Sequence, residues 1–278
     1  MAAEVSVIVP THNRLELLRR KLAALEAQTL EPERFEVVVV ADGCTDGTLD
    51  WLKAYRPPFA LTVLETPGKG PAYARNRGAE VASGRVLYLS DDDTFPAPQT
   101  LQHHLEAQTR RPGVYVGGLA WEDGTVWRPA VRWGRVHWAS LNGANTSLPL
   151  AAFRAVGGFW EGFDGYGVED LELGFRLART GLRFAYLPEA RAVHAGRPSL
   201  LNLEKARSAG RQAVRAVRHH QSAALAVELG VHPALLWIKR ILFGPFAPLL
   251  GARSAYERAY LEGAWAAWRA EPQPRERR

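Results

Sequence analysis

Three consecutive aspartates, Asp91, Asp92 and Asp93, have the types and spacing best suited to chemistry in this sequence. They directly follow the apolar run 86–89, which is typical of a buried strand. Three like charges at one strand end repel each other, so a counter-charge has to offset them. A helix cap or a solvated turn is the simpler interpretation, but a cap needs only one aspartate. Because hard oxygen donors at the carboxyl end of a strand suit magnesium or manganese holding a phosphate, we expect a metal site here.

Polar side chains also follow two earlier apolar runs. Thr11 and Asn13 come after the run 5–10, and Asp42 comes after the run 35–40. The carboxyl ends of parallel strands meet at one edge of a sheet, so we expect these groups to lie near the aspartates. Asp42 fits equally well as a cap for the next helix or as an acceptor for a base N–H or a ribose hydroxyl.

A glycine-containing segment, 68–70, precedes a predicted helix over 71–82. Lys69, with Arg75 and Arg77 one or two turns later, offers cations for a diphosphate. The segment is not a P-loop, because the spacing Gly-x-x-x-x-Gly-Lys-Ser/Thr is absent. No Gly-x-Gly-x-x-Gly follows the first predicted strand, which argues against a dinucleotide cofactor.

A second acidic group, Glu169 and Asp170, begins a predicted helix after an approach rich in glycine. Negative charge in a first helical turn suits the helix dipole, which is a sufficient structural explanation. A carboxylate held in such a place can also remove a proton from a sugar hydroxyl. His194, which ends a predicted extended segment, is more commonly structural when alone, but beside a metal it becomes a candidate ligand.

Four tryptophans, the first of them Trp121, lie among Gly, Arg and Pro between residues 117 and 138. Burial in a core explains some of them. The others offer flat faces on which sugar rings can stack.

The elements that position these residues alternate between strands and helices. Short apolar runs, over 5–10, 35–40 and 61–64, are predicted strands. They alternate with predicted helices over 15–27 and 48–55. This alternation predicts an α/β fold, in which a mostly parallel sheet has helices on both faces.

Length and cysteine content narrow the class of protein. A chain of 278 residues with 47% hydrophobic composition holds one large domain, or one domain and an appendage. The single cysteine, Cys44, excludes an internal disulfide framework and a multi-cysteine zinc site. The N-terminus has no basic region before an apolar core, and 5–10 is too short for a signal peptide or a span. We therefore expect a cytoplasmic protein.

The positive charge lies in the C-terminal part. Residues 1–197 hold 22 Lys and Arg against 23 Asp and Glu, a balance of −1, whereas residues 198–278 hold 13 against 6, a balance of +7. Arginines at 207, 211, 215 and 218 form one basic helical stripe. The run 233–250 is apolar, but charges and prolines make it too broken to span a bilayer. Residues 198–278 are thus either a helical appendage packed on the main domain or an amphipathic surface on anionic lipid, at the inner face of the cell membrane.

Five segments, in order, resemble glycosyltransferase family 2 of the GT-A fold: 5–14, 41–47, 74–78, 89–93 and 157–176. The last one also resembles the C-terminal half of the catalytic domain of β-1,4-galactosyltransferases. The resemblance covers about residues 4–200. It implies a catalytic domain over 1–197, with a nucleotide-sugar-binding half over about 1–116 and an acceptor-binding half over about 117–197. The basic, helical region 198–278 follows it.

The resemblance also implies a role for each matching residue. The nucleotide sugar would be held by Pro10, Thr11, Asn13, Asp42 (facing the base), Lys69, Gly70, Arg75, Asp91 and Asp92. Asp91 to Asp93 match the Asp-x-Asp motif, with Asp93 as the main metal ligand and Asp91 and His194 as further ligands. Asp170 matches the inverting general base, and Glu169 would orient the acceptor. The acceptor site would include Trp121, Asn145, Tyr166 and Gly167.

The implied reaction is the transfer of a sugar, with inversion, from a nucleotide-diphosphate sugar to a hydroxyl of a glycan or lipid-linked acceptor. It would depend on manganese or magnesium. UDP-sugars are the expected donors, although Ala41 replaces the aspartate that usually precedes Asp42, which weakens the preference for uridine.

Other classes of protein fit the sequence less well. A catalytically retired module that binds sugar nucleotides or acts as a scaffold would typically have lost Asp93 or Asp170, and both are present. A nucleotidyltransferase would carry a glycine-rich, basic loop after the first strand, which 11–14 is not. No recognised nucleic-acid-binding module is visible, so we expect no nucleic-acid partner.

Overall fold

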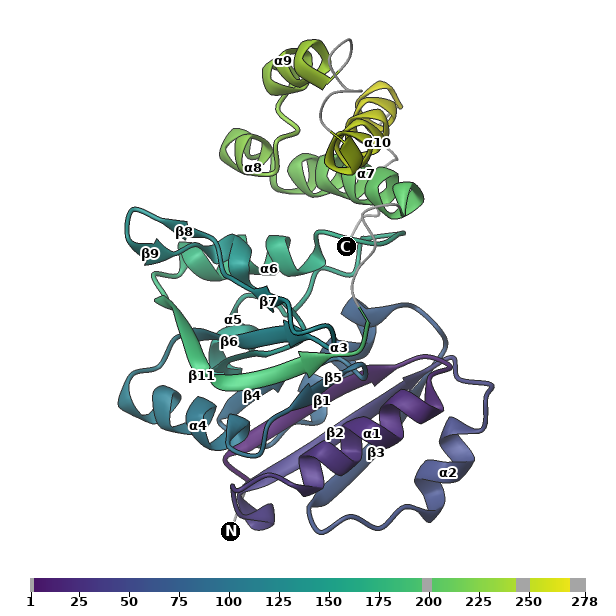
Figure 1. The fold of residues 1–278 in the computed structure, drawn as a ribbon, viewed down its shortest axis with the longest axis vertical. Helices are drawn as coiled ribbons and strands as arrows, with labels where there is room; N and C mark the ends of the chain where they lie inside the picture. The colour runs from purple at the N-terminus through teal and green to yellow at the C-terminus, as the bar shows by residue number, and fades with distance from the viewer. Residues whose placement is uncertain (1–2, 197–201, 244–250, 271–278) are drawn as a thin grey trace. The chain divides into compact units, whose positions relative to one another are not determined.

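The computed structural model describes residues 3–196, 202–243 and 251–270 (Figure 1). The chain forms two compact units, of residues 1–161 with 170–197 and of residues 162–169 with 198–278. The main division falls after residue 197, where the balance of charge changes sign.

The first unit is built on one mixed sheet, with strand order β3-β2-β1-β4-β10-β6-β11-β5 and β7 paired to β6. Its strands are β1 (Val5–Thr11), β2 (Phe35–Asp42), β3 (Ala60–Thr66), β4 (Val86–Leu89), β5 (Thr94–Pro96), β6 (Val114–Trp121), β7 (Val126–Trp127), β10 (Thr146–Pro149) and β11 (Phe184–His194). The short strands β8 (Val131–Arg132) and β9 (Arg135–Val136) form a separate ribbon. The strands β3, β2, β1 and β4 are parallel, as the alternating pattern predicts.

Strand β10 is short and leads directly into a helix. Its four residues lie antiparallel to both β4 and β6, and the helix begins at Leu150. Since Thr146, Ser147 and Leu148 are buried, this short strand fills the centre of the sheet. It joins the β4 side of the sheet to the parallel pair β6 and β11.

Helices cover both faces of the sheet, as expected (Figure 1). One core cluster joins Val7 and Val37 to leucines of α1 (Leu15–Glu26), α2 (Thr48–Ala54) and α4 (Thr100–Arg110). The other joins Ile8 and Leu87 to apolar residues of α3 (Pro71–Val81), α5 (Leu150–Ala155) and α6 (Glu169–Arg179). The near-continuous apolar sequence of β1, β2 and β4 follows from burial on both faces.

The register of the last strands brings distant residues to one edge. β11 is a single strand with a register shift between Leu187 and Arg191. At its end, His194 pairs with Trp121 of β6 on one side and with Thr94 of β5 on the other. His194 therefore lies next to the turn that carries the three aspartates.

The second unit is helical, with α7 (Leu203–His220), α8 (Ala223–Glu228), α9 (Pro233–Phe243) and α10 (Gly251–Arg269). α7 packs closely along α10 at two glycines, Gly210 and Gly263. A side chain at Gly210 would meet the carbonyl of Tyr260, and one at Gly263 would meet the carbonyl of Arg207. Among the described residues, none of the helices is long and apolar enough to cross a bilayer. The predicted continuation of the apolar run through Pro245 and Pro248 to Leu250 lies outside the described residues.

The arginines of the basic stripe on α7 form hydrogen bonds inside their own unit. The four arginines contact Glu262 (from Arg207, 3.0 Å), Glu204 (from Arg211, 3.0 Å), Asp164 (from Arg215) and the carbonyl of Trp268 (from Arg218, 3.1 Å). The helical periodicity is as predicted, but these arginines hold neighbouring segments of the unit together.

Candidate functional site

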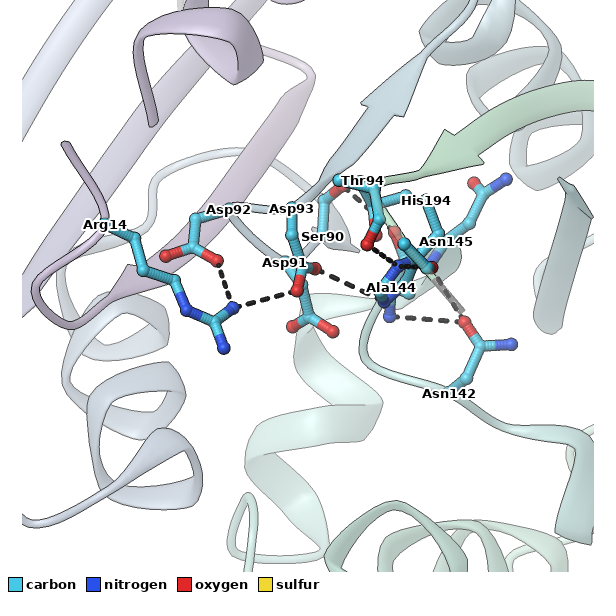
Figure 2. A network of polar contacts seen from close by, with 12 residues as sticks. Arg14, Ser90, Asp91, Asp92, Asp93, Thr94, Asn142, Ala144, Asn145 and His194 are labelled. Carbon is cyan, nitrogen blue, oxygen red and sulfur yellow. Dashed lines mark hydrogen bonds and ion pairs between the residues drawn. The ribbon is translucent and has the colours of Figure 1, made fainter. Parts of the chain in front are cut away.

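The three aspartates form the turn between β4 and β5, at the carboxyl edge of the sheet. Asp92 is buried and accepts a hydrogen bond from the Thr11 hydroxyl at 2.8 Å. Figure 2 shows Arg14 between two of the carboxylates, with Nη1 at 3.1 Å from Asp92 Oδ1 and 2.8 Å from Asp93 Oδ2. Burial raises the pKa of Asp92, and the Thr11 and Arg14 contacts oppose that rise.

Two further cations, Arg75 and Lys21, contact the same turn or the residues that flank it. Arg75 is buried and pairs with Asp91, Nη2 to Oδ1, at 2.5 Å. Lys21, which is fully buried, donates to the Ser90 hydroxyl and to the Thr94 carbonyl, so it holds both ends of the turn. Burial lowers the pKa of Lys21 to about 7 against the pull of the three carboxylates. The expected counter-charge is therefore supplied by three cations of the chain itself.

The Nε2 atom of His194 faces Asp93, and the contacts of the other ring nitrogen show which of the two carries the hydrogen. Its Nδ1 lies 2.9 Å from the carbonyl oxygen of Ala195 and 3.2 Å from that of Gly196. Carbonyl oxygens only accept, so Nδ1 carries the hydrogen. In the neutral ring, Nε2 is then an acceptor, and it lies 3.4 Å from Asp93 Oδ1. Two acceptors that face each other at this distance require a cation, either a proton or a metal ion, to join them.

This pair fits a divalent cation that is shared with a ligand. A metal-binding histidine commonly donates its other ring N–H to a backbone carbonyl, as His194 does. Within the described ranges, no three His, Cys, Asp or Glu side chains are grouped to hold a metal by themselves. Magnesium, and the similarly hard manganese, is held by one or two protein groups plus phosphate oxygens and water. Asp91, predicted as a further ligand, forms an ion pair with Arg75, and its role toward a metal stays a prediction.

The Asp42 side chain, which the resemblance places at the base, is held inside the protein, and its role toward a base stays a prediction. Its carboxylate is buried and accepts four hydrogen bonds, from the Thr66 hydroxyl (2.6 Å) and the backbone N–H groups of Gly68 (2.9 Å), Lys69 (3.1 Å) and Gly70 (2.6 Å). These three backbone N–H groups are thus used inside the protein. Asp42 shapes the loop before α3 and leaves the exposed Lys69 side chain beside Tyr73.

A hydrogen bond joins the segment that follows β1 to the segment that follows β2. Pro10 is buried in β1, and Asn13 adopts a positive φ of 53°. Asn13 Oδ1 accepts a hydrogen bond from the Thr45 backbone N–H at 2.6 Å. The two predicted nucleoside-side segments, 11–14 and 43–47, therefore lie side by side, as expected from neighbouring parallel strands.

Asp170 reaches the same edge through the loop before β10. Its Oδ2 accepts the Gly143 backbone N–H at 2.9 Å. Gly143 packs directly on the guanidinium of Arg75, where no side chain would fit, and Arg75 in turn pairs with Asp91. A continuous chain of contacts thus connects the candidate base to the aspartate turn.

Asn145 lies beneath the site and does not contact an acceptor, contrary to the prediction. It is fully buried, and its amide nitrogen donates to the carbonyls of Gly118 and Ala190 at 2.9 Å each. Its Oδ1 accepts from the Tyr88 hydroxyl (2.9 Å) and from His104 Nε2 (3.0 Å). The buried His104, whose pKa burial lowers to about 4, is therefore neutral and accepts from Ser147 at Nδ1. Sequence reasoning missed His104 because nothing local marks its partners 41 and 43 residues away.

The remaining acceptor-side candidates fall into two groups. Trp121 is half-buried and lies beside His194 in the sheet register, next to the candidate metal pair. Tyr166, Gly167 and Glu169 belong to the second unit, where Tyr166 is exposed with the Lys205 ammonium 4.5 Å from its ring centroid. Their roles toward an acceptor stay predictions.

Comparisons with known proteins identify two matching sequence families and several relatives. A sequence model described as glycosyl transferase family 2 matches residues 6–162, more than half of the chain, and one described as the N-terminal domain of galactosyltransferase matches 132–197. Validoxylamine A glucosyltransferase of Streptomyces hygroscopicus subsp. limoneus is 33% identical over 232 residues, covering 69% of this chain and 51% of the relative. The O-antigen biosynthesis protein RfbC of Myxococcus xanthus is 30% identical over 222 residues, covering 69% and 17%. The chain thus spans about half the length, or less, of these relatives.

Solved structures show a similar fold. The mannosyltransferase PcManGT from Pyrobaculum calidifontis, in complex with GDP-Man and Mn²⁺, superposes with a TM-score of 0.69 at 23% identity, over 98% of this chain and 89% of that one. S. aureus TarS 1–349 in complex with UDP-GlcNAc gives a TM-score of 0.61 at 18% identity, over 97% and 93%. These likenesses show that the fold is GT-A.

Proposed function

The chain belongs to glycosyl transferase family 2, and we propose that it transfers a sugar from a UDP-sugar to an acceptor hydroxyl with inversion at the anomeric carbon. The observation that carries this proposal is the pair formed by Asp93 and His194. Its two facing acceptor atoms suit a divalent cation at the carboxyl edge of a GT-A sheet, within a connected set of contacts that includes Asp170.

Asp93 and His194 would hold manganese or magnesium together with the donor diphosphate. When bound, the ion supplies Lewis-acid neutralisation of the charge that grows on the departing diphosphate. Arg14 lies beside this place, because it already bonds Asp93 Oδ2. Lys69 is exposed on the loop before α3, where it can contact the donor phosphates.

Asp170 is proposed to take the proton of the acceptor hydroxyl as that hydroxyl attacks the anomeric carbon. Gly143 fixes one carboxylate oxygen, which orients the side chain as a positioned base requires. The proton moves from the hydroxyl to the carboxylate while the bond from the sugar to the diphosphate breaks. Attack from the face opposite the leaving diphosphate inverts the configuration. Glu169, the preceding residue, is proposed to orient the acceptor.

The acceptor is proposed to be a hydroxyl of a glycan or a lipid-linked molecule, with Trp121 stacking on a sugar ring. Relatives of this chain are named for quite different acceptors, from validoxylamine A to poly(ribitol-phosphate), so the family alone does not choose among them. A place in the cytoplasm, at the inner face of the membrane, would suit a lipid-linked acceptor. The alternative is a retired sugar-nucleotide-binding module, which would keep the donor contacts without transfer.

A donor screen tests the proposal directly. We expect a UDP-sugar to raise the melting temperature of the protein in the presence of manganese, and less so with a chelator. The same donor should then be hydrolysed slowly, and transferred faster once a suitable acceptor is added, with inverted configuration in the product by NMR. Donor binding without hydrolysis or transfer across acceptor classes would support the retired module instead.

A further inference from the structure

Helix α9 of the second unit exposes an apolar face. Trp237, Ile238, Ile241 and Leu242 are 53–60% exposed, and their spacing of three and four residues places them along one side of the helix. Leu236, on the other side, is fully buried and anchors the helix to its unit. Contiguous large apolar side chains left in water mark an interaction surface.

Arginines lie directly beside this face. A groove of about 410 Å³ between α9 and α10 is lined by Arg240, Arg258, Leu261, Glu262, Trp265, Ala266 and Arg269. Arg240 belongs both to the groove and to the edge of the apolar face. Glu262 is already bonded to Arg207, and among the described residues no carboxylate forms an ion pair with Arg240, Arg258 or Arg269. On α7, in contrast, three of the four arginines form ion pairs with carboxylates.

We propose that this surface, the apolar face of α9 with the arginine groove beside it, binds an anionic membrane leaflet. The Trp, Ile and Leu side chains would enter the boundary between headgroups and acyl chains, and the arginines would contact lipid phosphates. Stable attachment of a chain to a bilayer surface needs two such signals, and this surface has both.

The charge pattern favours a membrane over other partners. Two copies that met through this surface about a two-fold axis would bring the arginines of one copy close to those of the other, which is repulsive. Nucleic acid would satisfy the arginines but would leave the aliphatic side chains of Ile238, Ile241 and Leu242 without a partner. A leaflet that contains anionic lipid satisfies both kinds of side chain.

Flotation of the full chain with vesicles tests this inference without donor or acceptor, so the result does not depend on the proposed transfer reaction. We expect binding to phosphatidylcholine vesicles that contain phosphatidylglycerol, and much weaker binding to phosphatidylcholine alone. High salt should weaken the binding, because it screens the arginines.

Variants separate the contribution of the arginines from that of the apolar face of α9. The triple change Arg240→Gln, Arg258→Gln, Arg269→Gln should lower the affinity for anionic vesicles about fivefold per arginine, or on the order of 100-fold in all. Trp237→Ser with Ile241→Ser should lower it at least ~10-fold, also at low salt. The matched control changes three exposed arginines of the first unit, Arg19, Arg110 and Arg111, to Gln. Circular dichroism and melting curves verify that each variant is folded.

Several results would overturn the inference. They are equal binding to neutral and anionic vesicles, no binding to either, or an equal loss in the control and the arginine variant. A dimer seen by light scattering that Trp237→Ser dissociates would assign the apolar face to a second copy of the chain. Binding of a DNA or RNA oligonucleotide that the Trp237 and Ile241 changes leave intact, without vesicle binding, would assign the arginines to nucleic acid.

Discussion

Two adjoining regions of the first unit hold the candidate site in opposite ways. The aspartate turn is held by charge, with Arg14, Arg75 and Lys21 against its three carboxylates. The loop 142–145, which positions Asp170 through Gly143, is held by neutral groups: Tyr88, His104, Asn145 and Ser147.

The difference follows from what each region has to do. Under the proposed function, the total charge at the turn would change as a metal ion and a diphosphate arrive or leave, and the compensating cations would keep the carboxylates together in their absence. At the loop, only the position of a backbone N–H matters, and a fully satisfied neutral network fixes it without placing a charge in the core. The two regions meet at Ser90, whose hydroxyl accepts from Lys21 and donates to the Ala144 carbonyl at 3.1 Å.

Asp170→Asn gives the largest expected effect, because it removes the chemical group that the neutral region positions. We expect kcat to fall by ~10²–10⁴-fold, with little change in donor affinity, since the amide keeps the shape but is a far weaker base. Single-turnover kinetics and donor titration measure the two quantities. Asp50→Asn, at an exposed carboxylate on α2, is the control. Normal transfer by the Asp170 variant would remove the base assignment.

Asp93→Ala tests the charged region in the same manner. We expect metal-dependent donor binding to weaken more than ~100-fold, beyond the 10- to 100-fold typical of losing a supporting partner only. His194→Ala should weaken it less, because the carboxylate and the diphosphate remain. Calorimetric titration of the donor with and without manganese measures both, with Asp50→Ala as control. A donor affinity that is independent of manganese in the unchanged protein would contradict the ligand assignment of the pair.

The sequence predicts the strand ends well, because each is marked locally. An apolar run followed by Thr11, Asp42 or Asp91 gives both the strand and the polar group at its end, and parallel pairing brings the ends to one edge. His194 was placed beside Asp93 only through the family resemblance, since 101 residues separate them and β11 carries a register shift.

The sequence does not show whether a polar side chain is directed into the protein or towards a ligand. Asp42 and Asn145 are the types that bind ligands, and both are used up by internal hydrogen bonds. Lys21 follows two exposed arginines in a helix and reads as a surface residue, yet it is fully buried beneath the turn. Its contacts depend on segments about 70 residues apart in the chain, which no local pattern encodes.

Acid should break the neutral region by charging it. Burial lowers the pKa of His104 from 6.5 to about 4, so above pH 6.5 the ring is neutral in the folded and the unfolded chain alike. As the pH falls from 6.5 towards 4, the unfolded chain binds a proton that the folded chain does not. The free energy of unfolding therefore decreases, by about 3 kcal/mol in all from this group.

Denaturant unfolding at several pH values measures this loss as a difference between the protein and a His104→Gln variant. The advantage of the unchanged protein should shrink as the pH falls through this window. His103→Gln, at the preceding and partly exposed histidine, should show no such trend. A constant difference across the window would mean that His104 is not neutral in the folded protein.

Lys21→Met removes a cation from the charged region and gives the smallest expected effect. Two influences on the metal oppose each other: the loss of a positive charge favours binding, and the loss of the contacts to Ser90 and Thr94 loosens the turn that carries Asp93. At about pH 8, above the lowered pKa of about 7, Lys21 is mostly neutral, so the lost contacts decide the outcome. We therefore expect manganese and donor to bind ~10-fold more weakly at that pH.

The size of this loss should depend on pH, which a purely structural defect would not produce. Below pH 7 the protonated lysine repels the metal, so its removal offsets part of the weakening, and the variant should approach the unchanged protein in metal affinity. Lys53→Met, at a lysine that is 74% exposed on α2, should change neither value. Equal manganese affinity of the Lys21 variant and the unchanged protein at both pH values would show that Arg14 and Arg75 alone hold the turn.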